Sequence, residues 1–367
     1  MIEEVKKDFL DTRDSNWAKV HYSFFSSCNN SCEFCIQKYL PKFFNNAADP
    51  DKLRSQFSIL ETWIRINSKK YKEIRIFILG GEIFYLPYNE YFSIYKFIFD
   101  KLRVLQDELN IIINVALTTS LIYKCTNLCE ASINYLLKYN LLREVEVSFD
   151  IIGRFASQVD VDTFYNNSIW LKKFINDNVY YNVAGVISRP AINEFIDNNS
   201  TNSVVKYAKE CFNYIYNEKV ASIEWGNMFL GTSDSEYLNK WVPNATEIYN
   251  FWQYMTKMYP NEKVSTKFLN LKKKEGYWCN GQCFMCWNGK IDSLCSYGFD
   301  KDVLVKLKLP IENRLERSII LKKIFESYKC LQCEHFKRCD IHDCLWRWDL
   351  SIFENWTKCW KKDLYNK

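Results

Sequence analysis

The chain has 367 residues, and 49 Lys and Arg against 44 Asp and Glu leave a formal net charge of +5. The length allows two or three domains, and so small a charge excess, spread along the chain, does not indicate a nucleic-acid partner. Because the amino terminus is charged and no run of about 18 apolar residues occurs, a signal peptide and a membrane span lack support, and a cytoplasmic protein without a membrane partner is expected.

Six short runs rich in branched and aromatic residues alternate with amphipathic segments, and each run is predicted to be a strand. The predicted strands are Lys19–Phe25, Glu73–Leu79, Ile111–Thr118, Glu144–Phe149, Tyr181–Ile187 and Ala221–Asn227. Helical spacing appears between them, for example at Leu53, Phe57, Leu60 and Ile64. This alternation predicts an α/β fold with a parallel sheet. Six units predict a partial (β/α)6 barrel of the TIM type, whose active site lies at the carboxyl ends of the strands.

The strand and helix alternation stops near Val264, where a tail rich in cysteine and aromatic residues begins. We therefore predict an N-terminal arm over residues 1–17, the barrel over 18–263 and a cysteine-rich domain over 264–367. The last region has little continuous apolar periodicity, so we expect metal sites to stabilise it.

The loop after the first predicted strand carries Cys28, Cys32 and Cys35 in the pattern CxxxCxxC. In a reducing cytosol, cysteines serve metal binding or catalysis more often than disulfide formation. Three thiolates can hold three irons of a [4Fe-4S] cluster and leave the fourth iron open to a substrate or cofactor. A zinc knuckle is the alternative, but structural zinc usually takes four protein ligands, and no fourth Cys or His follows nearby.

A second motif, Gly80, Gly81 and Glu82, follows the second predicted strand. Glycines let a ligand approach the backbone, and the glutamate can accept a hydrogen bond from an ammonium group. CxxxCxxC followed one βα unit later by Gly-Gly-Glu resembles the radical S-adenosylmethionine superfamily, and the resemblance covers about residues 18 to 260.

The resemblance implies that the open iron binds S-adenosylmethionine, whose reductive cleavage yields methionine and a 5′-deoxyadenosyl radical that abstracts hydrogen from the substrate. It also implies a flavodoxin- or ferredoxin-type electron donor. By the same resemblance the cluster ligands are Cys28, Cys32 and Cys35, Phe34 lies near the adenine, and Gly80, Gly81 and Glu82 receive the methionyl amine. In such enzymes the cofactor carries the chemistry and the protein aims it.

The fourth predicted strand ends in Ser148-Phe149-Asp150, where related sequences with similar tails often read S-x-D-G. The resemblance therefore implies that Ser148 and Asp150 contact the cofactor, although Ile151 replaces the glycine here. The alternative is that the two polar residues end the strand and cap the next helix.

Nine cysteines lie in the tail: Cys279, Cys283, Cys286, Cys295, Cys330, Cys333, Cys339, Cys344 and Cys359. Their spacing resembles the SPASM extension of radical S-adenosylmethionine enzymes, which holds two auxiliary [4Fe-4S] clusters, so three clusters are implied. The runs after Gly289 and between Cys339 and Cys344 are one residue longer than is usual. Paired zinc sites are the alternative, because their CxxC spacing is locally the same.

The pairing usual in SPASM proteins implies two ligand sets. The nearer auxiliary cluster takes Cys279, Cys295 and Cys344 with either Cys283 or Cys286, and the farther takes Cys330, Cys333, Cys339 and Cys359. One cysteine is then spare, and Cys283 or Cys286 is the candidate catalytic thiol. No catalytic base is identified. The remaining cysteines, Cys125, Cys129 and Cys211, are expected to be small buried residues.

The family resemblance implies an oxidoreductase that crosslinks or oxidises a peptide or protein substrate, as in the maturation of ribosomally made peptides. Only about 17 residues precede the first predicted strand, so a separate leader-binding protein or the tail is expected to recognise a leader. The alternatives are a peptide epimerase that uses the spare thiol, a small-alcohol or sugar dehydrogenase, and a non-catalytic iron-sulfur or zinc protein. A formylglycine-generating sulfatase maturase is less favoured, because Ser296 stands where those enzymes carry an aspartate base.

Overall fold

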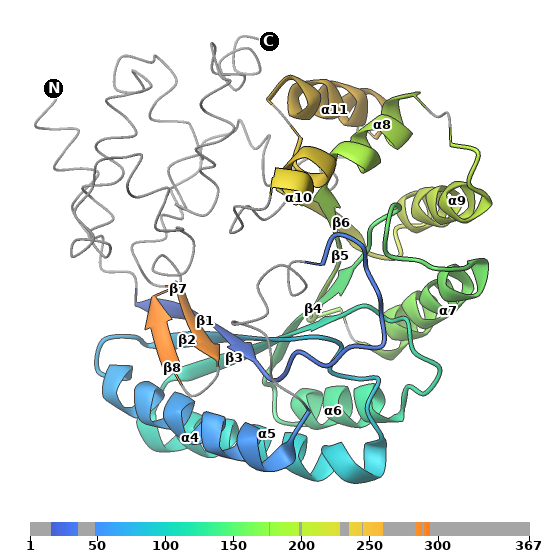
Figure 1. The fold of residues 1–367 in the computed structure, drawn as a ribbon. Coiled ribbons are helices and arrows are strands. Elements are labelled where there is room, and N and C mark those ends of the chain that lie inside the picture. The colour runs from blue at the N-terminus through green and yellow to red at the C-terminus, as the bar shows by residue number, and fades with distance from the viewer. Residues whose placement is uncertain are drawn as a thin grey trace, which may run out of the picture.

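A parallel sheet with helices on its outer face forms the body of the protein. The computed structural model describes residues 16–35, 48–175, 177–197, 200–227, 235–243, 245–259, 283–287 and 290–293. Its first six strands are β1 (Trp17–Ser23), β2 (Glu73–Leu79), β3 (Ile112–Thr119), β4 (Leu142–Ser148), β5 (Tyr180–Ile187) and β6 (Ser222–Asn227). They lie in the order β6-β5-β4-β3-β2-β1, and each is parallel to its neighbour. The curved sheet in Figure 1 confirms the predicted partial barrel.

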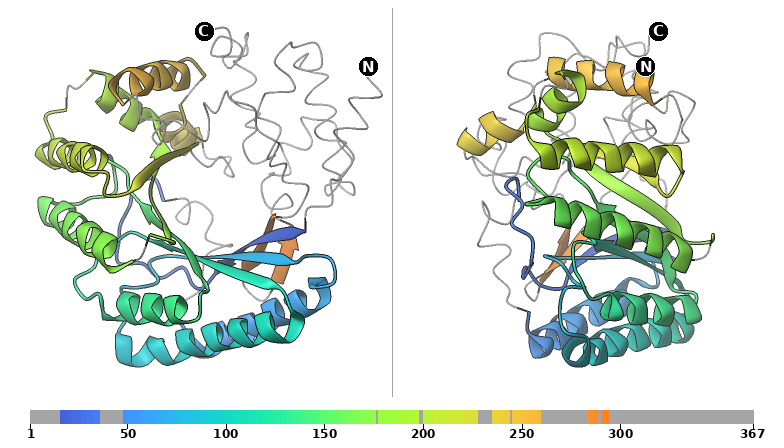
Figure 2. Two further views of the ribbon diagram at one scale, coloured as in Figure 1. Left: turned by 180° about the vertical axis from the view of Figure 1, so that it is seen from behind. Right: turned by 90° about the vertical axis from the view of Figure 1, so that its right-hand side faces the viewer.

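Within the described residues, eight helices connect or follow these strands. They are α4 (Pro50–Asn67), α5 (Tyr88–Leu109), α6 (Asn127–Lys138), α7 (Gln158–Phe174), α8 (Arg189–Asp197), α9 (Ser203–Asn217), α10 (Ser235–Trp241) and α11 (Ala245–Met258). Figure 2 shows α4, α5, α6, α7 and α9 along the outside of the sheet. Among the described helices, none combines the length and the apolar character needed to cross a membrane.

Local sequence explains where several helices begin. The Asp49 side chain caps α4 by accepting hydrogen bonds from the backbone of Asp51 and Lys52, and Ser157 and Asp160 form a capping box at the start of α7. The residues that α4 buries include the four apolar positions predicted from their spacing, namely Leu53, Phe57, Leu60 and Ile64. Helical periodicity therefore identified the face of α4 that packs on the sheet.

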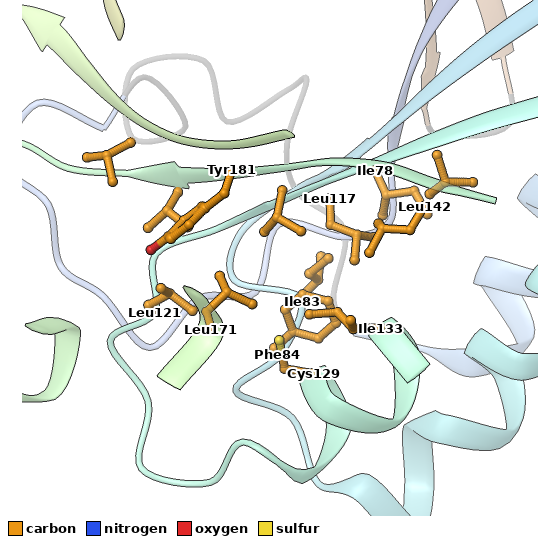
Figure 3. Close-up of a cluster of buried hydrophobic side chains, with 14 of the residues drawn as sticks. Ile78, Ile83, Phe84, Leu117, Leu121, Cys129, Ile133, Leu142, Leu171 and Tyr181 are labelled. Carbon is orange, nitrogen blue, oxygen red and sulfur yellow. The ribbon is translucent and has the colours of Figure 1, made fainter. Parts of the chain in front are cut away.

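Alternation along the strands separates the core from the barrel interior. In β1, Val20 and Tyr22 are buried against the helices, whereas Lys19 and His21 alternate with them and are only partly buried. Figure 3 shows the helix-facing core, where Ile78 and Leu117 of the sheet lie with Ile133 and Cys129 of α6. The helix-facing core thus holds the parallel strands in place and fixes the positions of their carboxyl ends.

The predicted strand bounds agree with the structure within two residues, and those of β2 agree at both ends. β1 ends at Ser23, two residues earlier than predicted. Phe24 and Phe25 are instead buried in the loop that follows the strand. Their rings pack edge to face on Tyr95 and Tyr91 of α5, contacts that periodicity along β1 does not reveal.

A hairpin from the tail extends the sheet beside β1. Strand β7 (Cys283–Trp287) pairs in parallel with β1, and β8 (Lys290–Ser293) pairs antiparallel with β7. We predicted no strand in this region. The hairpin covers the edge of β1, which would otherwise expose unpaired backbone groups. The domain boundary near residue 264 stays a prediction.

Candidate functional site

The CxxxCxxC loop lies at the carboxyl end of β1, as predicted. Cys28 is exposed, Cys32 is buried and Cys35 is partly buried, and all three thiols are free. The backbone N–H of Asn30 donates to the Cys28 sulfur over 3.3 Å. The carboxyl edge of such a sheet is where barrels of this type carry their active sites.

The donors on this loop fit a three-cysteine iron-sulfur site. In the part of the chain that the structure describes, no three His, Cys, Asp or Glu side chains gather closely enough to hold a single metal ion. A four-iron cluster makes a different demand, because each of its cysteines binds a different iron and the sulfurs do not converge on one point. Three free thiols on one loop, one of them accepting a backbone N–H, match that donor chemistry.

The Gly-Gly-Glu turn at the end of β2 packs directly against the cysteine loop. The Gly81 N–H donates to the Phe25 carbonyl over 2.7 Å, and the Glu82 N–H donates to the Ser27 carbonyl over 3.0 Å. A Cβ added to Gly81 would lie 1.9 Å from the Ser27 carbonyl oxygen, and one added to Gly80 would lie 2.3 Å from that of Phe25. The glycines thus allow the two loops to meet. That a ligand also approaches the backbone at these glycines stays a prediction.

The side chain of Glu82 is fully buried under this turn. One carboxylate oxygen accepts hydrogen bonds from the Phe84 N–H over 3.0 Å and the Thr119 hydroxyl over 2.9 Å. The other accepts from the Ser120 N–H over 2.5 Å. Burial raises the pKa of Glu82, and these hydrogen bonds oppose that rise. Glu82 therefore links the end of β2 to the end of β3, while its predicted contact with the methionyl amine stays a prediction.

Replacing Glu82 with Gln should lower the free energy of unfolding by about 1–3 kcal/mol, because one carboxylate oxygen becomes an NH2 group that faces protein donors. Chemical denaturation measures this loss. The control is Glu61→Gln at the surface of α4, where the pair with Arg65 is worth about 0–1 kcal/mol. An equally small effect of both substitutions would contradict the structural role of Glu82.

The residues that follow β4 are held by a buried ion pair. The Arg154 guanidinium donates to one oxygen of Asp150 from Nε over 2.8 Å and from Nη2 over 2.7 Å. The other Asp150 oxygen accepts from the Val186 N–H over 2.8 Å, so Asp150 also joins the ends of β4 and β5. Contact of Ser148 and Asp150 with a cofactor stays a prediction. The alternative that they cap the next helix is wrong, because Ser157 caps α7.

Sequence reasoning did not identify Arg154, which lies beside the cysteine loop. Its guanidinium carbon is 5.4 Å from the centre of the Phe34 ring, and the Glu33 N–H donates to the Gly153 carbonyl over 2.8 Å. The spacing of Asp150 and Arg154 at positions i and i+4 was the available signal for their pairing. Nothing in that spacing indicated that the pair would lie against Phe34.

A small apolar cluster covers the second half of the cysteine loop. It contains Cys32, Phe34, Tyr237, Trp241 and Val242. The rings of Phe34 and Trp241 meet edge to face with centres 5.7 Å apart, and the Tyr237 hydroxyl donates to the Phe34 carbonyl over 3.1 Å. Helix α10 therefore fixes the segment between Cys32 and Cys35, and no sequence motif predicted this contact. The predicted contact of Phe34 with adenine stays a prediction.

Cys286 lies on the helix-facing side of the sheet. On β7 it is in register with Tyr22 of β1, whose hydroxyl donates to the Leu53 carbonyl of α4 over 3.3 Å. Cys286 is fully buried, and burial raises its pKa to about 12. Position 283, three residues earlier on the same strand, is in register with Lys19.

The other cysteines divide between described and undescribed parts of the chain. Cys129 and Cys211 are buried, as predicted. The prediction is wrong for Cys125, which is exposed because it lies in the loop before α6 rather than on that helix. The tail cysteines outside the described residues are Cys279, Cys295, Cys330, Cys333, Cys339, Cys344 and Cys359. Their roles as auxiliary-cluster ligands stay predictions.

A polar cavity lies at the opposite edge of the sheet from the cysteine loop. Its volume is about 1120 Å³, and its lining includes Glu73, Arg75, Asn114 and Glu144 from the first halves of three strands. The cavity lies at the amino ends of the strands and the cysteine loop at their carboxyl ends, so the cavity is not part of the candidate site.

Comparison with known proteins reveals similarity of fold. No protein-family model matches the chain, and no curated protein matches it. A solved structure of native anSMEcpe with bound AdoMet has a TM-score of 0.58 and 15% identity, and the match covers 95% of this chain and 96% of that one. The two chains therefore share a fold.

Two further solved structures are less similar. Methylornithine synthase (PylB) has a TM-score of 0.36 and 9% identity, with 69% of this chain and 65% of that chain covered. Coproporphyrinogen III oxidase (HemN) from Escherichia coli, described as a radical SAM enzyme, has a TM-score of 0.41 and 9% identity, with 77% and 65% covered.

Proposed function

We propose that this protein is a radical S-adenosylmethionine enzyme whose open cluster is held by Cys28, Cys32 and Cys35. The observation that carries the proposal is the direct contact between the Gly-Gly-Glu turn and the loop that carries CxxxCxxC. The backbone N–H groups of Gly81 and Glu82 donate hydrogen bonds to Phe25 and Ser27, the residues that lead into Cys28, at the carboxyl edge of the sheet. The shared fold with a structure that has AdoMet bound supports the same proposal.

When bound, the cluster and S-adenosylmethionine supply a 5′-deoxyadenosyl radical that abstracts hydrogen from the substrate. The residues of this chain hold and orient the two bound groups. Gly80 and Gly81 allow close approach of the backbone at the turn, and Glu82 fixes the turn to the end of β3. Phe34 packed on Trp241 shields one side of the loop from water.

The proposed substrate is a peptide or protein, and the proposed outcome is a crosslink or an oxidation. The cysteine spacing of the tail supports this choice, because the SPASM extension it resembles carries auxiliary clusters. An auxiliary cluster suits both outcomes, since a substrate radical must lose an electron to close a bond or form a double bond. We propose a flavodoxin- or ferredoxin-type protein as the donor that reduces the first cluster.

The position of Cys286 favours Cys283 as the functional member of the pair. A thiol buried between the sheet and α4 is separated by the sheet from the barrel interior, where a substrate radical would form. We therefore propose that Cys286 is a packing residue. Cys283 is then either a ligand of the nearer auxiliary cluster or, in the epimerase alternative, the hydrogen donor.

Product mass in deuterated water tests the proposed outcome. Reconstituted protein with reductant and S-adenosylmethionine should form 5′-deoxyadenosine, and a precursor peptide encoded beside the gene should lose two hydrogens without gaining deuterium. The matched variants are Cys283→Ala, which should alter product or iron content, and Cys286→Ala, which should alter neither. Replacement of one hydrogen by one deuterium, with no loss of two hydrogens, would instead support epimerisation, and absence of 5′-deoxyadenosine would contradict the enzyme class.

A further inference from the structure

The buried pair formed by Asp150 and Arg154 has no part in the motifs that led to the proposed function. Side-chain exposure is 5% for Asp150 and 11% for Arg154. A buried ion pair is weak evidence for stability, because the cost of removing two charges from water offsets much of their attraction. Stability alone therefore does not explain why the pair lies at this place in the fold.

The two charges of the pair face different neighbours. Asp150 is tied to β5 by the Val186 N–H, whereas the guanidinium of Arg154 extends over the ring of Phe34, which stands between Cys32 and Cys35. The positive end of the pair therefore faces the cysteine loop, whereas the negative end is turned toward β5.

The loop cannot move away from this charge easily. Its backbone is joined to the Arg154 segment by the 2.8 Å hydrogen bond from Glu33 to Gly153, and a Cβ on Gly153 would lie 3.3 Å from side-chain atoms of both Glu33 and Phe34. From the other side, Tyr237 and Lys240 of α10 hold the same segment through bonds to Phe34 and Glu33. The guanidinium is thus held at a fixed place beside the thiols.

We propose that Arg154 is a positioning residue that holds a fixed positive charge beside the cysteine loop and raises the reduction potential of the cluster bound there. The inference rests on the proposed function. Reduction adds one negative charge to a cluster, and a nearby buried cation stabilises that state because little water screens it. Net charge and exposure are known determinants of iron-sulfur potentials.

The test is a redox titration of the reconstituted full chain, followed by EPR. The cluster in question is the one whose signal changes when S-adenosylmethionine is added, and its potential is then measured without that cofactor. Arg154→Gln should shift the potential to a more negative value, and Arg154→Lys, which keeps the charge, should restore most of the shift. Asp150→Asn removes the opposing charge and should shift the potential to a more positive value.

The control is Arg75→Gln, which breaks a 2.6 Å pair with Glu73 at the other end of the barrel and should leave the potential unchanged. Iron per chain is measured for every variant. An unchanged potential in Arg154→Gln, or a negative shift in Asp150→Asn, would overturn the inference about Arg154. Loss of iron in Arg154→Gln with an unchanged potential in the remaining cluster would assign Arg154 to packing. A wild-type protein without a cluster would instead refute the proposed function.

Discussion

Replacing Cys28, Cys32 and Cys35 together with Ala should abolish reductive cleavage of S-adenosylmethionine and remove about one third of the iron. The unchanged protein should bind about 12 iron atoms, because three four-iron clusters are proposed. In the proposed ligand sets only the cluster of this loop lacks a fourth protein ligand, so only its loss should remove the open iron. Iron analysis and chromatography of 5′-deoxyadenosine measure the two effects.

The control for this substitution is Cys125→Ala, which removes an exposed thiol outside the proposed site and should change neither quantity. If 5′-deoxyadenosine still formed in the triple variant, the cofactor would bind elsewhere. A wild-type protein that contained zinc and little iron would contradict the iron-sulfur proposal altogether.

Replacing Gly81 with Ala should displace the cysteine loop and reduce cluster binding at that loop. The new Cβ would lie 1.9 Å from the Ser27 carbonyl oxygen, and a backbone atom cannot rotate aside as the end of a side chain can. Overpacking of this kind costs about 1–3 kcal/mol, and here the strain falls on the segment that leads to Cys28. Denaturation and iron content together measure the effect.

The matched control is Gly185→Ala on β5, where the new Cβ would meet the Trp225 ring at 2.5 Å. This substitution should also lower stability, but the cysteine loop should keep its iron because Gly185 does not touch it. Equal iron content in the two variants would show that the contact between Gly81 and Ser27 does not position the loop.

The sequence by itself determined the barrel and the location of the cysteine loop. Buried and partly buried side chains alternate with a period of two along a strand, so both ends of the strand Glu73–Leu79 could be predicted. The spacing of Leu53, Phe57, Leu60 and Ile64 likewise identified the buried face of α4. CxxxCxxC could be placed at the carboxyl end of β1 because it directly follows a recognisable strand.

The tertiary structure alone decided which distant residues meet at that loop. Trp241 and Tyr237 lie on α10, which follows β6, and they contact Phe34 because β6 and β1 both end at the carboxyl edge of the sheet. Neither residue belongs to a local pattern that would reveal this contact. The same holds for Arg154, whose pairing with Asp150 follows a helical spacing but whose contact with Phe34 does not.

The proposal that favours Cys283 over Cys286 as the functional cysteine also required the fold. Both residues have the same chemistry and lie three positions apart, so their spacing left both roles open. Pairing of β7 with β1 puts Cys286 in register with Tyr22 and therefore against α4. Register between strands depends on how the whole sheet packs, and a one-residue shift would reverse the face on which each side chain lies.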